Sequence, residues 1–305
     1  VAERDGRYLA TFARGTYQGI AAPHAVEIDL PAGIRADAPL VLVAEGWVYP
    51  TDSSINLAVG QGGAPKASGL ALDAQDASGG WRQVVPDLGF PAGKNKSMLI
   101  DLAPARGARR LRLRTNLEIY WDRLSVGERA EPLQRVERLA ASRAELRFRG
   151  FSQTSSPRGE APETPDYARL ANVAPRWRDL IGYHTRFGDV GELLAGVDDR
   201  YVIMNAGDEL RLEFPERPAP ARGWRRDFVL VGDGWEKDGD YNTGFSQTVL
   251  PLPSHAQPAY GQGLPEARAQ ELELEADPVY RAHRGDWERF HTRFVRPDRF
   301  VGGLR

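Results

Sequence analysis

The residues best suited to holding an ion lie in a short acidic stretch that ends at Asn242. Asp238, Asp240 and Asn242 occupy alternate positions, and Asp233 lies a few residues before them. Calcium loops bring several side-chain oxygens onto one ion in this way. An EF-type loop also needs Gly at its sixth position and Glu at its twelfth, and this stretch has neither. A polar turn, in which Asp238 or Asp240 accepts hydrogen bonds from backbone amides, is the favoured interpretation, and a calcium site is the alternative.

The acidic stretch follows an apolar run that occurs twice. Residues 40–47 and 228–235 are identical at five of eight aligned positions, which are Val, Leu, Val, Gly and Trp. Each run comes after an alternating stretch that ends in Pro, so the likeness extends beyond the run itself. The first copy keeps Asp52 opposite Asp240 but has Pro and Ser opposite the other two oxygen donors. We therefore predict two related units, and no ion in the first.

The apolar runs also supply the candidates for ligand binding. Trp47 and Trp235 end the two copies, and an exposed indole ring can stack against the face of a sugar. Trp is also the largest core side chain and is highly buried on average. Because the two residues are equivalent in the repeat, a place in the core or at its rim is favoured over glycan binding.

Motifs for catalysis are absent from the sequence. The chain has no Cys, its five His show no zinc-ligand spacing, and it has no nucleophile elbow, phosphate loop or dinucleotide fingerprint. Asp198 with Asp199, or Glu118 with Asp122, would suit a glycosidase only if folding set the carboxyl groups about 5 to 10 Å apart. Catalytic residues are therefore unknown at this level, and we expect no cofactor other than calcium.

Short alternating runs predict strands in the first part of the chain. They cover residues 24–30, 39–47, 54–61, 97–102, 109–116 and 117–124, separated by Pro, Gly and Asp clusters. In residues 110–114 Arg and Leu alternate, which predicts a buried face and a wet face. So many short strands predict an antiparallel β-sandwich of jelly-roll-like form.

The rest of the chain predicts a helix, a second sandwich and a tail. Apolar residues at helical spacing predict a linker helix, strand signals return at residues 199–215, 225–235 and 246–253, and a short helix is expected within residues 277–293. A five-residue echo occurs at 183–187 and 290–294, and five residues are too few to establish a second duplication. The predicted all-β organisation is sandwich 1 at residues 1–127, linker helix 128–144, sandwich 2 at residues 145–255, and a wrapping C-terminal tail at residues 256–305.

Charge and hydropathy exclude two classes of partner. The net charge is -2, so no overall field attracts nucleic acid or an anionic membrane. No apolar stretch approaches the roughly 20 residues that cross a bilayer, so membrane insertion is not expected. The chain begins with Val and lacks signal-peptide features there, and we expect any targeting segment to lie upstream.

Several stretches together resemble a known family. They are EGWVYPTDSSINLAVGQ, LGFPAGKNK, TNLEIYWDRL, HTRFGDVGELLAGVDDRYVIMNAGDELRLEF and RRDFVLVGDGWEKDGDYNT, within residues 20–255. They are similar to the C-terminal region of bacterial exported proteins with FG-GAP (VCBS-type) repeats and an ASPIC/UnbV segment, relatives of cartilage acidic protein. The resemblance implies an extracellular, periplasmic or cell-surface location, and it supplies no catalytic residue.

These observations favour a non-catalytic binding or assembly module of a secreted or cell-surface bacterial protein. A glycan or another surface protein is the expected partner, and self-association is open as well. Two alternatives remain at this point. One is a polysaccharide-acting enzyme with carboxylates in a groove between the domains. The other is a structural subunit of an extracellular assembly.

Overall fold

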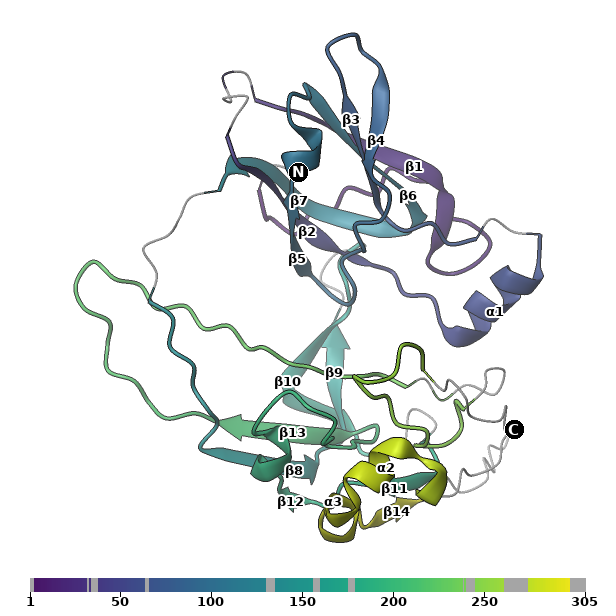
Figure 1. The fold of residues 1–305 in the computed structure, drawn as a ribbon, viewed down its shortest axis with the longest axis vertical. Helices are drawn as coiled ribbons and strands as arrows, with labels where there is room; N and C mark the ends of the chain where they lie inside the picture. Colours follow the sequence, from purple (N-terminus) through teal and green to yellow (C-terminus); the bar gives the residue numbers. More distant parts are fainter. Residues whose placement is uncertain are drawn as a thin grey trace. The chain divides into compact units, whose positions relative to one another are not determined.

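The computed structural model describes residues 3–31, 33, 38–63, 66–129, 135–155, 160–174, 179–237, 239, 245–260 and 274–296. Strands in several antiparallel sheets dominate these residues, with three short α-helices, which confirms the predicted all-β class. The chain divides into two compact units (Figure 1). Unit 1 comprises Val1–Gln134 and Thr154–Asp166, and unit 2 comprises Arg135–Gln153 and Tyr167–Arg305.

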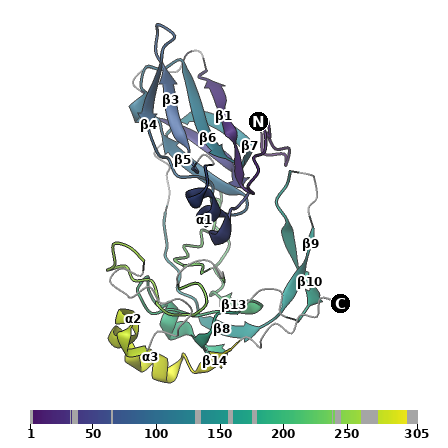
Figure 2. The same cartoon turned by 90° about the vertical axis from the view of Figure 1, so that its right-hand side faces the viewer.

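Unit 1 consists of two antiparallel sheets (Figure 2). One has the order β1 (Ile20–Asp29), β6 (Arg110–Leu117), β3 (Ala71–Gln75) and β4 (Trp81–Val85), and the other has the order β5 (Lys96–Asp101), β2 (Leu40–Val48) and β7 (Ile119–Glu128). A short 3-10 helix, η1 (Ala103–Ala105), follows β5. Side chains of both sheets form one core, in which Leu42 of β2 meets Leu72 of β3 and Leu111 of β6. The two sheets therefore pack face to face.

The alternation of Leu and Arg in β6 gives the strand one buried face and one more open face, as the sequence predicts. Leu111 and Leu113 are at most 1% exposed, and the arginines between them point to the other face. There Arg112 and Arg114 both contact the buried carboxylate of Asp73 on β3, at 2.8 and 3.2 Å. Burial favours the neutral acid, but hydrogen bonds from both arginines outweigh it and lower the pKa of Asp73.

Residues 54–61, predicted to be a strand, belong instead to helix α1 (Ser53–Gln61). The Asp52 side chain accepts a hydrogen bond from the amide of Ile55 at 2.7 Å and caps the first turn. Asp is among the strongest N-capping residues, and Ser-Ser after it suits a helix start. The prediction was wrong because the alternation alone favours a strand, whereas the Asp52 cap favours a helix start.

Unit 2 contains smaller sheets. β8 (Arg143–Phe148) lies between β12 (Gly188–Asp189) and β13 (Asp208–Glu213), and β11 (Gly182–His184) pairs with β14 (Arg293–Val295). β9 (Phe151–Ser155) pairs with β10 (Thr164–Asn172), and the part of this hairpin within Thr154–Asp166 belongs to unit 1. The helical segments are η2 (Gly191–Leu194), η3 (Leu274–Ala276), α2 (Pro278–Ala282) and α3 (Arg284–Arg289). Across the described ranges, no helix combines the length and hydropathy of a bilayer span.

The described helical part of the predicted C-terminal tail, residues 274–289, contributes to the core of unit 2. Tyr280 and Trp287, from α2 and α3, pack in one apolar cluster with Val249 and Leu250. Asp277 caps α2 by accepting hydrogen bonds from the amides of Val279 and Tyr280. The predicted helix within residues 277–293 is confirmed as two short helices, because a turn at His283 separates them.

The predicted linker helix differs from the structure. It was expected at 128–144, of which residues 130–134 lie outside the described residues. Residues 135–142 are irregular, and strands end at Glu128 and begin at Arg143. Val136 is 75% exposed, so this apolar side chain does not pack on a neighbouring surface. Short helices depend on such packing for their stability.

Three predicted strands of unit 2 also differ. The strand expected at 225–235 is an irregular segment, and the strand expected at 199–215 is only β13. Residues 246–253 contribute an isolated bridge, between Thr248 and Ile181, instead of a strand. A strand needs a neighbour along its length, and the composition of a run does not specify one.

Candidate interaction site

Trp47, the first candidate for ligand binding, lies inside unit 1. The residue is 7% exposed, and its ring stacks on Tyr120 with centroids 4.8 Å apart. The indole N–H donates to the carbonyl of Glu160 at 3.0 Å. A ring covered in this way favours the core interpretation, since no open face is left for a sugar.

The proposed calcium ligands are only partly described. Asp238, Asp240 and Asn242 lie outside the described residues, whereas Asp233 lies inside them. Its carboxylate is 2.9 Å from Nε2 of His255. Among the residues with a described placement, no group of three or more His, Asp or Glu side chains is arranged to hold a metal.

The residues before Asp233 form an exposed apolar run. Phe228, Val229, Leu230 and Val231 are between 73% and 86% exposed. None of their backbone groups makes a hydrogen bond to another described residue. Figure 1 draws this part of the chain as a plain trace after the end of β13. The run is irregular in the single chain, and apolar β-formers with open backbone groups can pair with another strand.

Trp224 and Trp235 flank the exposed run. They are 53% and 57% exposed. The Trp224 amide donates to the carbonyl of Ala221, which makes a turn before the run. The Trp235 ring leans on Tyr260 with centroids 5.3 Å apart. Trp235 is therefore exposed to solvent, whereas the equivalent Trp47 is buried.

Three contacts fix the C-terminal end of the run to unit 2. Asp233 binds His255, Trp235 leans on Tyr260, and Nζ of Lys237 donates to the carbonyls of Val249 and Leu250 at 3.2 and 3.0 Å. Burial lowers the pKa of Lys237 to about 7. The carbonyl contacts satisfy donors that burial would otherwise leave unpaired. The run is thus attached at its end and open along its length.

His255 connects two carboxylates. Its Nδ1 lies 2.6 Å from Asp199, and its Nε2 lies 2.9 Å from Asp233. An imidazole donates from both nitrogens only when it is protonated. The hydrogen bond to Asp199, followed by that to Asp233, raises the pKa of His255. The histidine therefore acts as a clamp between the run and residue 199.

Asp199 is the fixed end of this clamp. Besides His255, it accepts hydrogen bonds from the hydroxyl groups of Ser254, at 2.9 Å, and Tyr201, at 3.2 Å. Burial alone would raise its pKa, but the amide and imidazole of His255 and the two hydroxyls lower it to about 2. The carboxylate is ionised at neutral pH and is fully occupied as an acceptor.

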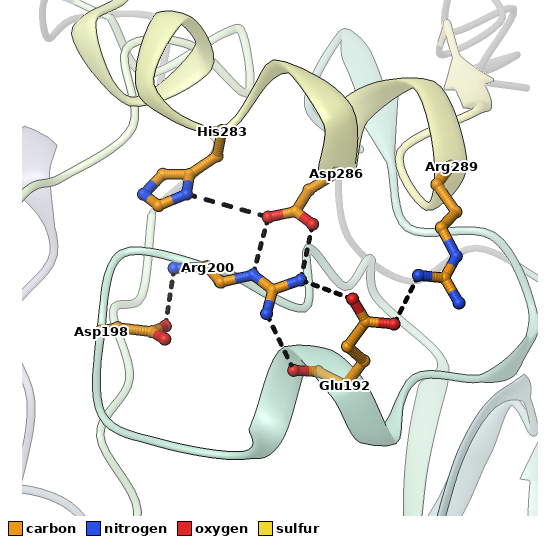
Figure 3. A network of polar contacts seen from close by, with 6 residues as sticks. All are labelled: Glu192, Asp198, Arg200, His283, Asp286 and Arg289. Carbon is orange, nitrogen blue, oxygen red and sulfur yellow. Dashed lines mark hydrogen bonds and ion pairs between the residues drawn. The ribbon is translucent and has the colours of Figure 1, made fainter.

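Arg200, the next residue, holds the C-terminal helices in place (Figure 3). Its guanidinium binds Asp286 of α3 through two hydrogen bonds of 2.7 and 2.8 Å, and it reaches Glu192 at 3.1 Å. Arg289 also contacts Glu192. Bidentate Arg–carboxylate pairs are among the stronger polar contacts, and this one lowers the pKa of Asp286.

The two copies of the His-Thr-Arg-Phe echo lie side by side. In the pairing of β11 with β14, Tyr183 faces Phe294 and His184 faces Arg293. Arg293 lies over the ring of Phe187, 4.3 Å from its centre. The sequence contains the echo but gives no signal that the copies would pair.

The histidines of this echo are buried. His184 is 1% exposed and His291 is 4% exposed. Nδ1 of His291 is 3.0 Å from the hydroxyl of Thr185. Burial lowers the pKa of each to about 4, so both imidazoles are neutral at physiological pH. They serve as core residues.

The carboxylate pairs considered for a glycosidase have other contacts. Glu118 is buried, accepts the hydroxyl of Tyr120 and lies 3.1 Å from Arg14. Asp122 accepts the amide of Gly6 at 2.9 Å. Asp198 accepts the amide of Arg200 at 2.8 Å. Each of these acids therefore has an intramolecular partner.

Comparison with known proteins gives no match to a protein-family model, a curated protein or a solved structure.

Proposed function

We propose that the chain is a non-catalytic assembly module that binds an extended polypeptide strand along residues 228–231. The observation that carries this proposal is the exposure of four consecutive apolar side chains whose backbone groups have no described partner. Strand addition supplies backbone hydrogen bonds and pockets for alternate side chains at once. Exposed apolar patches of this kind mark protein–protein contact sites.

The attachment of the run supports this reading. The His255 clamp and the Lys237 contacts hold its C-terminal end, so less conformational freedom remains to be lost on binding. Preorganisation of this kind improves affinity because it lowers the entropic cost of association. The resemblance to exported bacterial proteins supports a secreted or cell-surface location, where such a module would connect chains.

A labelled strand-forming peptide of alternating Thr and Val tests this function. We expect its fluorescence anisotropy to rise when the wild-type chain is added. An added strand uses alternate N–H groups on one edge, and Pro removes one such donor. Val229→Pro and Leu230→Pro should therefore differ, with one of them losing binding several-fold. Equal binding by both variants and the wild type would refute strand addition.

Glycan binding at the flanking tryptophans is the second candidate. The exposure of Trp224 and Trp235 favours it, because both rings retain open surface. A soluble oligosaccharide would then change tryptophan fluorescence, and Trp224→Ala would abolish the change. Under the assembly proposal, the Pro variants affect binding and the oligosaccharide has no effect.

A further inference from the structure

We infer that the strand bound at residues 228–231 is the same run of a second copy of this chain, paired antiparallel with Val229 facing Val229. This inference rests on the proposed function and names its partner. Each copy offers the same open segment, so two copies satisfy one another about a twofold axis. In such a pairing, one central residue faces its own counterpart and every other residue faces a different one.

Charges around the run favour this register. With Val229 at the centre, Arg225 faces Asp233 of the other copy at both ends of the pairing. Opposite charges across an antiparallel pair are stabilising, and like charges are destabilising. A register shifted to Leu230 would set Asp227 against Asp233, two carboxylates facing each other. Within its own chain, Arg225 pairs with Asp227 at 2.9 Å, and the pairing adds a second carboxylate opposite it. The centre at Val229 therefore avoids a repulsion and places opposite charges at both ends.

The apolar and aromatic residues fit the same register. Phe228 faces Leu230 of the other copy, twice by symmetry, so exposed apolar surface is covered on one face. Trp224 faces Gly234, and an aromatic ring over a cross-strand glycine covers backbone that the glycine leaves bare. The pairing thus covers side chains that are more than half exposed in the single chain.

The first copy of the repeat provides an internal precedent. β2 carries the same Val-Leu-Val sequence and is bonded on both sides, to β5 and to β7. A run of this composition in this chain is therefore compatible with a central place in an antiparallel sheet. The equivalent run in unit 2 lacks described neighbours, and a second chain can supply one.

Disulfide trapping tests the register, because the natural chain contains no Cys. Facing residues in an antiparallel pair have Cα atoms about 4.5 to 5.5 Å apart, within the range that a disulfide spans. Val229→Cys should form a covalent dimer under mild oxidation several-fold faster than Phe228→Cys or Leu230→Cys. These two are matched controls, since each is similarly exposed but does not face itself.

Light scattering on the wild-type chain completes the test. We expect the mass to double as the concentration rises, and Arg225→Asp to weaken the dimer because the new carboxylate would face Asp233. A single-chain mass at all concentrations, or cross-linking that is no faster at position 229, overturns the inference. If the Thr-Val peptide still binds in that case, strand addition stands and the partner is another chain. If the chain neither dimerises nor binds the Thr-Val peptide, the proposed function is refuted as well.

Discussion

Acid should destabilise unit 2 through its two buried histidines. His184 and His291 have pKa values of about 4 in the folded chain, against 6.5 for an unperturbed histidine. The charged groups nearest to them are Arg293 and Asp208, which face His184, and Asp286, which faces His291. Burial dominates over these charges in lowering both pKa values.

The sign of the pH effect on folding stability follows from proton binding. Between pH 6.5 and about 4 the unfolded chain binds protons at these two sites and the folded chain does not. The contribution of the two neutral histidines to folding stability is therefore fully present above pH 6.5 and is lost as the pH falls through this window. At about pH 5, some 1.5 units below the unfolded value, the loss is about 2 kcal/mol for each histidine.

Urea denaturation measures this loss. The fluorescence of Trp287, whose ring centroid is 4.9 Å from that of His291, reports unfolding of unit 2. We expect the difference in unfolding free energy between about pH 7.5 and about pH 5 to be about 2 kcal/mol smaller in His291→Gln than in the wild type. Gln keeps a polar group near Thr185 but does not titrate in this range.

His24→Gln is the control, since it removes a partly exposed histidine from unit 1. His255 has a raised pKa and acts in the opposite direction, because its contribution is lost as the pH rises. That contribution is common to the wild type and His291→Gln and cancels in the comparison. Equal pH dependence in these two proteins would refute the reasoning from burial.

Three further predictions concern other parts of the chain. His255→Ala removes the clamp, so limited proteolysis within residues 228–237 should accelerate several-fold; unchanged cleavage would argue against the clamp. Gly46→Ala places a Cβ 2.3 Å from a backbone carbonyl of the neighbouring strand and should cost about 2 kcal/mol in urea denaturation, whereas Gly127→Ala, which meets nothing within 4 Å, should be close to neutral. Calcium titration by calorimetry should give no heat, and binding that Asp240→Ala abolishes would contradict the polar-turn interpretation.

The sequence predicts those parts of the fold in which local pattern and burial agree. In β6 the alternation of Leu and Arg matches one buried and one open face, and in the tail Asp277 marks a helix start. In α1 the alternation conflicts with the cap at Asp52, and the cap determines the structure.

The candidate site was less predictable. The repeat predicts a strand for residues 228–235 because Val-Leu-Val is a strand in the first copy, yet a strand needs a neighbour that composition does not specify. The sequence gives no signal for the contacts of His255, because its partners Asp199 and Asp233 are distant in the sequence. No spacing rule connects such residues, since only folding brings them together.

Hydrogen exchange of the exposed run tests the central claim most directly. Residues 41–43 and 229–231 have the same Val-Leu-Val sequence, so their intrinsic exchange rates are closely matched. In the dilute chain we expect protection of 41–43, which β5 and β7 flank, and free exchange of 229–231. At concentrations where the chain assembles, residues 229–231 should become protected as well. Protection of 229–231 in the dilute single chain would show that the run is already paired internally, and would contradict its proposed role in assembly.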